Sequence, residues 1–167
     1  MEGNYCEANA KKRKTAGDTA IKVLIVAGIV LCVIMSLLTA LTILLLPAAV
    51  LGIVAYFVFP RLNVEYEYVF CDGQIDFDKI MNGDRRKRLA RVDMEGVVVC
   101  APIKSHALDG YKREGVRQLN YSSLEENANV WGLVVTSGEQ QTLYMFEPSE
   151  EMVLKMKQKA PRKVVEY

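Results

Sequence analysis

No charged side chain occurs between Val23 and Pro60, and most residues of this stretch are Val, Leu, Ile, Ala, Phe or Met. As one helix with a rise of about 1.5 Å per residue, the stretch would be about 57 Å long. That length is nearly twice the ~30 Å hydrocarbon core of a bilayer. The stretch is therefore too long for one ordinary span, and it predicts a two-helix transmembrane hairpin over residues 20–60.

The position of the turn in this hairpin follows from a few polar residues and one proline. Ser36, Thr39 and Thr42 are the only Ser and Thr residues of the stretch, and Pro47 follows shortly after them. Proline is tolerated in the first turn of a helix and disfavoured in its interior. We expect a first helix that ends near residue 38, a turn within residues 38–43, and a second helix that ends near residue 59.

Basic residues flank the apolar stretch on both sides. Four of them lie between Lys11 and Lys14, Lys22 starts the first helix, and Arg61 directly follows the second. Because basic residues favour the cytoplasmic side, both termini are expected in the cytoplasm, which requires two spans of the cell membrane. The alternative is one long tilted helix, which would place the two basic ends on opposite sides. Membrane lipids are the expected surroundings of residues 20–60.

The remaining chain divides into a short tail and one domain. Residues 1–19 are polar and basic, and we expect them to form a disordered N-terminal tail. Residues 61–167 suffice for one small domain with its own core. The formal net charge of the 167 residues is only +1, which argues against a nucleic-acid partner.

The domain begins with alternating polar and apolar residues, a pattern typical of β-strands. In the first strand Val64, Tyr66, Tyr68 and Phe70 share one face. Asp72-Gly73 then predicts a hairpin turn, after which Ile75 and Phe77 point inward and Asp76 and Asp78 outward. Further strands are expected at residues 87–93, 96–101, 116–121, 130–136 and 141–146.

The chain ends with a helical pattern. Pro148 suits a first helical turn, and Met152, Val153, Met156 and Ala160 form one apolar face. Pro161 ends the helix. Seven strands and one amphipathic helix predict a small antiparallel β sandwich or barrel that is capped by the C-terminal helix. With the transmembrane hairpin, the fold class is an α+β membrane protein.

This order of elements resembles the pleckstrin-homology-like (PH-like) fold. In sequence the chain is similar to an uncharacterised family of small two-span membrane proteins from clostridia and related Gram-positive bacteria. The resemblance is carried by residues 61–68, Asp72-Gly73, the basic run 85–91, Ala101-Pro102 and the closing segment 147–163. It implies a cytoplasmic PH-like domain and no assigned activity. Lipid-binding members of the wider fold place Lys and Arg in the first hairpin loop, whereas residues 71–74 here contain none.

One cluster of side chains is a candidate contact site. The five cations within residues 85–91 are Arg85, Arg86, Lys87, Arg88 and Arg91. Near an anionic leaflet each cation contributes about 1 kcal/mol of attraction. The run is a candidate for contact with anionic lipid headgroups or with an acidic partner protein. In the simplest interpretation it is a solvated strand whose charges discourage edge pairing.

Other polar groups provide weaker candidates. Asp72, Asp76 and Asp78 lack the wrapping loop of a hard-cation site and are expected to face solvent. His106 and Asp109 lie close in sequence, but no nucleophile motif accompanies them. The four cysteines match no zinc or redox spacing. We therefore expect no metal, no cofactor and no enzymatic activity.

The combined pattern predicts a non-enzymatic anchored module. It would present a PH-like domain at the cytoplasmic membrane face for interaction with another membrane or cytoplasmic protein. The alternative is a sensor of anionic lipid headgroups that acts through the basic run 85–91.

Overall fold

A computed structural model describes residues 5–113, 115–138 and 140–166 of the chain. The chain forms two compact units. The helical unit comprises Lys14–Val64. The second unit, the β-domain, combines the segment before Lys14 with the chain from Glu65 onward.

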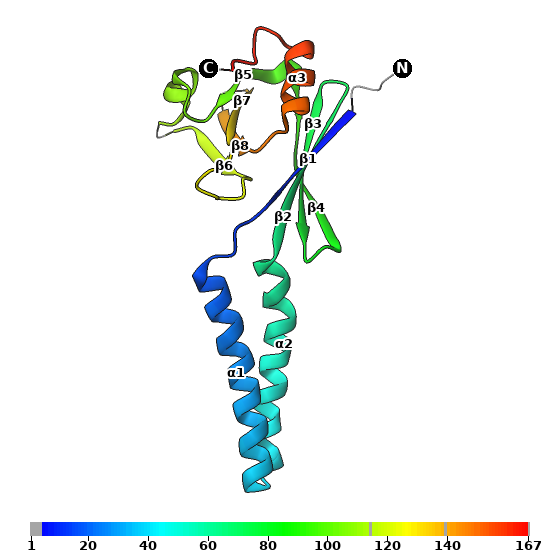
Figure 1. Cartoon of the computed structure of the whole chain (residues 1–167), viewed down its shortest axis with the longest axis vertical. Helices are drawn as coiled ribbons and strands as arrows, with labels where there is room; N and C mark the ends of the chain where they lie inside the picture. The colour runs from blue at the N-terminus through cyan, green and yellow to red at the C-terminus, as the bar shows by residue number, and fades with distance from the viewer. Residues whose placement is uncertain (1–4, 114, 139, 167) are drawn as a thin grey trace. The chain divides into compact units, whose positions relative to one another are not determined.

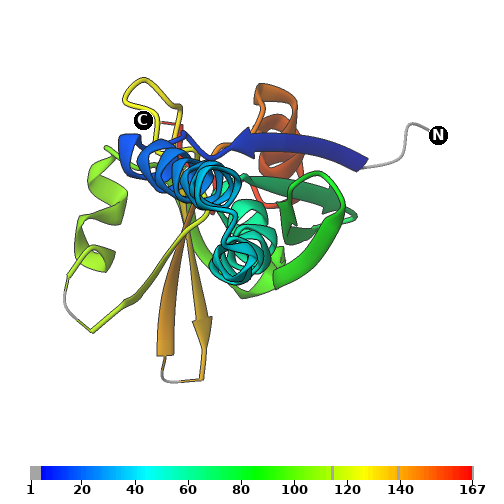
Figure 2. The same cartoon turned by 90° about the horizontal axis from the view of Figure 1, so that it is seen from below.

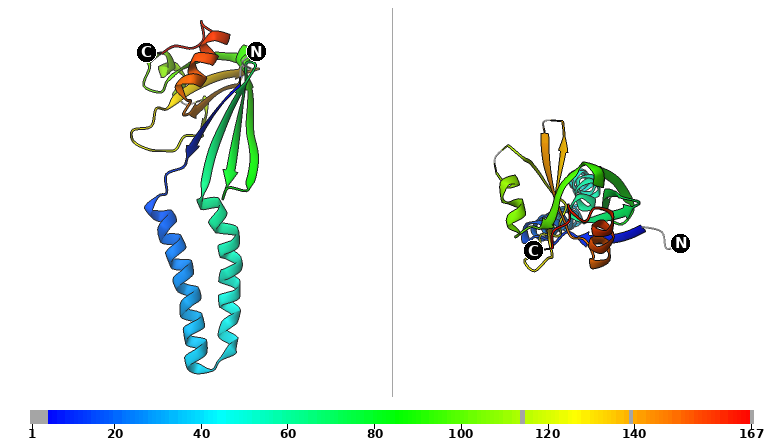
Figure 3. Two further views of the ribbon diagram at one scale, coloured as in Figure 1. Left: turned by 45° about the vertical axis from the view of Figure 1, so that its right-hand side comes forward. Right: turned by 90° about the horizontal axis from the view of Figure 1, so that it is seen from above.

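The helical unit is an antiparallel hairpin (Figures 2 and 3). Helix α1 spans Ala16–Thr39, a short 3-10 turn η1 spans Thr42–Leu44, and α2 spans Leu45–Leu62. Ala40 ends α1 in the left-handed conformation, with φ of 53°. Pro47 lies in the first turn of α2, as expected from its missing N–H group. The sequence prediction of two helices with a turn within residues 38–43 is confirmed.

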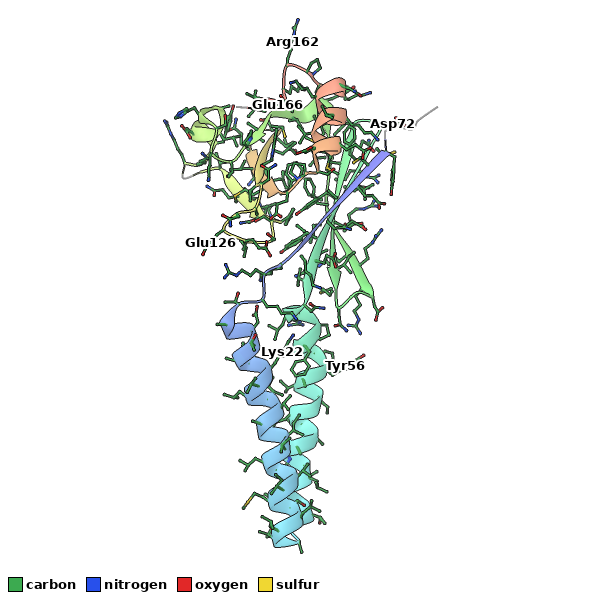
Figure 4. The ribbon with its side chains drawn as sticks, in the orientation of Figure 1. Lys22, Tyr56, Asp72, Glu126, Arg162 and Glu166 are labelled. Carbon is green, nitrogen blue, oxygen red and sulfur yellow. The ribbon has the colours of Figure 1, made fainter. Side chains whose placement is uncertain are left out.

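Both helices are long and apolar enough to cross a membrane. Most of their large apolar side chains are exposed, and Lys22 and Tyr56 lie toward the open end of the hairpin (Figure 4). Where the helices meet, the contact is close: a Cβ atom added at Gly28 would lie 3.2 Å from Cδ1 of Leu51. The Ser36 hydroxyl donates a hydrogen bond to the carbonyl oxygen of Leu41 at 3.1 Å, which ties α1 to the turn.

The first sheet of the β-domain contains four strands in the order β1-β2-β3-β4 (Figure 1). Their bounds are β1 Tyr5–Lys11, β2 Val64–Cys71, β3 Gln74–Met81 and β4 Arg85–Asp93. Asp72-Gly73 forms the predicted turn between β2 and β3, with both residues at positive φ. The turn between β3 and β4 lies at the opposite end of the sheet.

Strand β1 corrects the expectation of a disordered tail over residues 1–19. Tyr5–Lys11 pairs antiparallel with β2, from Tyr5 opposite Cys71 to Lys11 opposite Glu65. Cys6 and Ala10 are buried in the core. Beyond the strand, the Arg13 amide donates to the Ser123 carbonyl oxygen at 2.8 Å. Residues 1–4 of the expected tail lie outside the described residues.

The second sheet has the order β5-β7-β8-β6. Its strands are β5 Val97–Pro102, β6 Arg117–Asn120, β7 Trp131–Ser137 and β8 Gln140–Phe146. All pairs are antiparallel except β6 with β8, which is parallel. Two 3-10 turns, η2 Met94–Gly96 and η3 His106–Tyr111, and helix α3 Glu150–Lys159 complete the domain.

The core lies between the two sheets and beneath α3. Phe77 is its centre, with ring centroids 5.4–5.8 Å from those of Tyr68, Tyr121, Tyr144 and Phe146. Met152 and Met156 of α3 are fully buried against this layer. The seven predicted strands are confirmed as β2–β8 and the predicted helix as α3. The sheets form an open sandwich rather than a closed barrel.

Candidate functional site

The predicted basic run lies on β4, where an irregular register determines which way each side chain points. Phe77 of β3 pairs with Ala90, but Asp78, the next residue, pairs with Arg88. Leu89 is therefore an extra residue, a β-bulge, which shifts the alternation of β4 by one position. In a regular strand Arg88 and Arg91 would point to opposite faces. The bulge brings both to the outer face of the sheet.

Arg91 and Asp76 form the best-defined ion pair of this face. Arg91 Nε donates to Asp76 Oδ1 and its second nitrogen to Oδ2, both at 2.6 Å. Such a bidentate contact is the strongest geometry for an ion pair between an arginine and a carboxylate. The hydrogen bond from Arg91 is the main cause that holds the pKa of Asp76 below its usual value. Arg88 adds a second contact to Asp76 at 3.5 Å.

Arg86 lies over two further carboxylates. It forms an ion pair with Glu67 of β2 and lies 3.8 Å from an oxygen of Asp78. Arg88 reaches the other oxygen of Asp78 at 3.9 Å. The Glu67 and Asp78 side chains are only 10% and 8% exposed, whereas that of Arg86 is 57% exposed. The guanidinium groups therefore cover the carboxylates from the solvent side.

This arrangement corrects the expectation that Asp76 and Asp78 face solvent. Both do lie on the outer face of the sheet, but Asp78 is buried. The arginines of β4 fold over the aspartates because opposite charges attract across neighbouring strands. No group of metal-binding side chains occurs among the described residues.

The five cations of the predicted site therefore differ in their surroundings. Arg86, Arg88 and Arg91 are compensated by Glu67, Asp76 and Asp78, and these six residues are called the ionic cluster below. Lys87 is exposed and lies directly opposite Lys79 of β3. Arg85 lies opposite Met81 at the start of β4.

Glu67 and Lys79 were not predicted as site residues. Alternation places Glu67 on the outer face, but only the fold shows that Arg86 reaches it from two strands away. Lys79 follows Phe77 by two positions, so alternation alone places it on the inner face. Its pairing with Lys87 depends on the bulge.

The β2–β3 turn lies at the other end of the sheet, where Figure 4 labels Asp72. A pocket of about 460 Å³ at this end is lined by residues that include four carboxylates and two cations. They are Asp72, Asp76, Asp93, Glu95, Arg91 and Lys159. This end therefore carries mainly acidic groups, in keeping with the absence of Lys and Arg from the turn itself.

A smaller pocket lies between α3 and the start of β7. It has a volume of about 270 Å³ and is lined by Asn129, Trp131, Glu150, Val153, Leu154 and Glu166. Leu154 is 56% exposed, although it belongs to a helix whose other large apolar side chains are buried. Glu166 pairs with Lys157 at 2.9 Å. The lining of this pocket thus combines apolar side chains with two carboxylates.

The remaining candidates lie apart from both pockets. The His106 side chain is fully exposed and its Nδ1 lies 3.0 Å from an oxygen of Asp109, which also contacts Lys112. Cys100 is buried in the core, and this burial raises the pKa of its thiol. All four cysteines are free thiols.

Comparison with known families adds one match. The family model described as "Bacterial PH-like domain (DUF6106)" matches residues 2–166. The chain belongs to this family. The match includes β1, both apolar helices and the entire β-domain, so the expected resemblance to a two-span family with a PH-like domain is confirmed. No curated protein and no solved structure matches the chain.

Proposed function

We propose that this chain is a non-enzymatic membrane-anchored module that holds its PH-like domain at the cytoplasmic face for contact with another protein. The proposal rests on the pairing of β1 with β2, on the ionic cluster and on the pocket beside α3.

The observation that carries the proposal is the position of β1. Strands β1 and β2 precede and follow the two apolar helices in the chain, yet they pair along their whole length in one sheet. Two strands of one sheet must lie on the same side of a membrane. The chain between them therefore has to cross an even number of times, which supports two spans over one long span.

The basic residues support the cytoplasm as the side that holds the domain. Lys12 and Lys14 precede α1, Lys22 lies in the second turn of α1, and Arg61 lies in the last turn of α2. Positive charge beside the ends of a span favours retention on the cytoplasmic side.

A binding role agrees better than catalysis with the state of the reactive groups. His106 projects fully into solvent, and the Cys100 thiol is enclosed in the core. The carboxylates of the ionic cluster are occupied by arginines. A nucleophile and a base within hydrogen-bonding reach of each other would be the usual sign of covalent catalysis.

The pocket beside α3 supports protein contact. Leu154 offers exposed apolar surface beside the buried Val153, and Glu150 carries a charge that no described residue compensates by an ion pair. An apolar centre with a polar rim is typical of a protein interface. A peptide segment that places an apolar side chain beside Lys or Arg would match both features.

The alternative, contact of the whole basic run with lipid headgroups, has less support. Three of its five cations already neutralise carboxylates of the same sheet. Each would have to leave its partner before it could bind a phosphate.

A photo-crosslinking residue in place of Leu154 tests the protein contact in cells. We expect one membrane or cytoplasmic protein, identified by mass spectrometry, to crosslink at this position and to be lost on Glu150→Lys. The matched control is the same residue in place of Glu151, which is exposed on α3, pairs with Lys155 and does not line the pocket. Equal crosslinking at both positions, or none at Leu154, would contradict the proposed surface.

A further inference from the structure

Both helices are connected to the same end of the first sheet. Lys11, the last residue of β1, pairs with Glu65 at the start of β2. Helix α1 begins at Ala16, and α2 ends at Leu62. The β3–β4 turn lies at this same end of the sheet, because β3 runs antiparallel to β2 (Figure 1). This end is called the helix-side end below.

Two lysines face each other at the helix-side end. Lys79 and Lys87 are direct partners across β3 and β4. Neither forms an ion pair with any residue that the structure describes. Like charges directly opposite each other destabilise a sheet. An anion bound between them would remove this repulsion. The only carboxylate in the adjoining turn is Asp84, and Arg85 follows it directly.

An aromatic group lies on the same inner face. Phe77 precedes Lys79 by two positions on β3, and its ring contacts those of Tyr121 and Tyr144 at 5.6 and 5.4 Å. Tyr66 joins this group through Tyr121 at 5.7 Å. All three tyrosines are half-buried. Tyrosine and lysine are both favoured at the boundary between membrane and water.

We propose that the helix-side end of the β-domain docks on anionic lipid headgroups, with phosphate oxygens between Lys79 and Lys87 and tyrosine rings beside them. The proposal goes beyond the anchoring role, because it determines which surface of the domain faces the membrane. Docking at this end would turn the acidic pocket at the β2–β3 turn toward the cytoplasm.

The chemistry favours a lipid surface over an acidic protein. The chain itself holds this end within a few residues of the helices that enter the membrane, so headgroups are present there at high local concentration. Each lysine near an anionic surface shifts the docking equilibrium by about fivefold. The two lysines together are expected to shift it by about 25-fold.

The test uses the full chain in nanodiscs with a fluorophore at Met81→Cys, beside the β3–β4 turn. Cys32→Ala and Cys71→Ser remove the two native thiols that are not buried. Nanodiscs contain phosphatidylcholine alone or with about one third phosphatidylglycerol, and a small fraction of lipid carries a headgroup nitroxide. Quenching of the fluorophore by the nitroxide reports the distance of the turn from the headgroups.

We expect strong quenching with phosphatidylglycerol and weak quenching with phosphatidylcholine alone. Lys79→Gln with Lys87→Gln should abolish the difference. The control pair Lys104→Gln with Lys112→Gln, which removes two exposed charges elsewhere, should leave it unchanged. Inorganic phosphate added to phosphatidylcholine nanodiscs should not restore quenching, because docking requires the lipid surface.

Quenching that does not depend on phosphatidylglycerol would overturn the proposal. So would quenching that is reduced equally by the Lys79/Lys87 substitutions and by the control substitutions. Circular dichroism of each variant shows whether the fold is retained. Failure here would leave the two-span anchor and the α3 pocket untouched, because neither involves Lys79 or Lys87. Conversely, a failure of the crosslinking test at Leu154 would not affect the quenching expected here.

Discussion

Arg86→Glu is expected to destabilise the β-domain by about 3 kcal/mol, the largest effect of any single change in the basic run. The substitution removes the positive charge above Glu67 and Asp78 and adds a third carboxylate beside them. The Arg86 side chain is half-exposed, but Glu67 is buried and would lose the cation that it pairs with, which leaves its charge uncompensated in a poorly solvated site. Thermal or denaturant unfolding followed by Trp131 fluorescence measures the effect. Trp131 is the only tryptophan of the chain and lies in the β-domain core.

The matched control is Lys87→Glu, one residue away and with the same change of charge. It should leave stability unchanged or raise it by about 0.5 kcal/mol, because a glutamate opposite Lys79 replaces a repulsive pair with an attractive one. If the two reversals had equal effects, the basic run would behave as uniform solvated charge. That result would contradict the assignment of Arg86 to the ionic cluster.

Ala10→Glu is expected to destabilise the β-domain by about 3 kcal/mol or more and to release β1 from the sheet. Ala10 is 3% exposed and lies opposite Tyr66. A carboxylate there would be buried without a partner, which is among the most destabilising single changes. Unfolding by Trp131 fluorescence and proteolysis of the N-terminal segment in the full chain both report the change.

Glu7→Lys serves as the control on the same strand, because Glu7 is exposed and lies opposite Val69. It should change stability little and leave the N-terminal segment resistant to protease. An Ala10→Glu chain as stable and as resistant as Glu7→Lys would mean that β1 does not belong to the domain.

The contrast between the helices and β1 shows which features a single sequence reveals. The absence of charge from Val23 to Pro60 and the position of Pro47 are local properties, so both helices and their turn could be predicted. In β1 the inward residues are Cys6, Ala8 and Ala10, which are small and give little hydrophobic signal. Basic residues directly follow them. Strand β1 forms because it pairs with β2, which comes more than 50 residues later in the chain.

The candidate site was predictable in composition but not in geometry. Five cations within residues 85–91 are evident in the sequence, and so are Asp76 and Asp78. The extra residue Leu89 has no signal of its own, yet it decides that Arg86, Arg88 and Arg91 share a face. The same bulge leaves Lys87 opposite Lys79. From the sequence alone, residues 85–91 look like one basic patch. The fold divides their charges between the neutral ionic cluster and a separate pair of lysines.

The central claim is that residues before α1 and after α2 belong to one domain on one side of the membrane. Glu7→Cys and Gln158→Cys, each in a Cys32→Ala/Cys71→Ser chain, test it by labelling with a membrane-impermeant thiol reagent. Intact cells and inside-out vesicles are compared. The account predicts that both cysteines react only in the vesicles. Labelling of one from outside the cell and of the other from inside would contradict it.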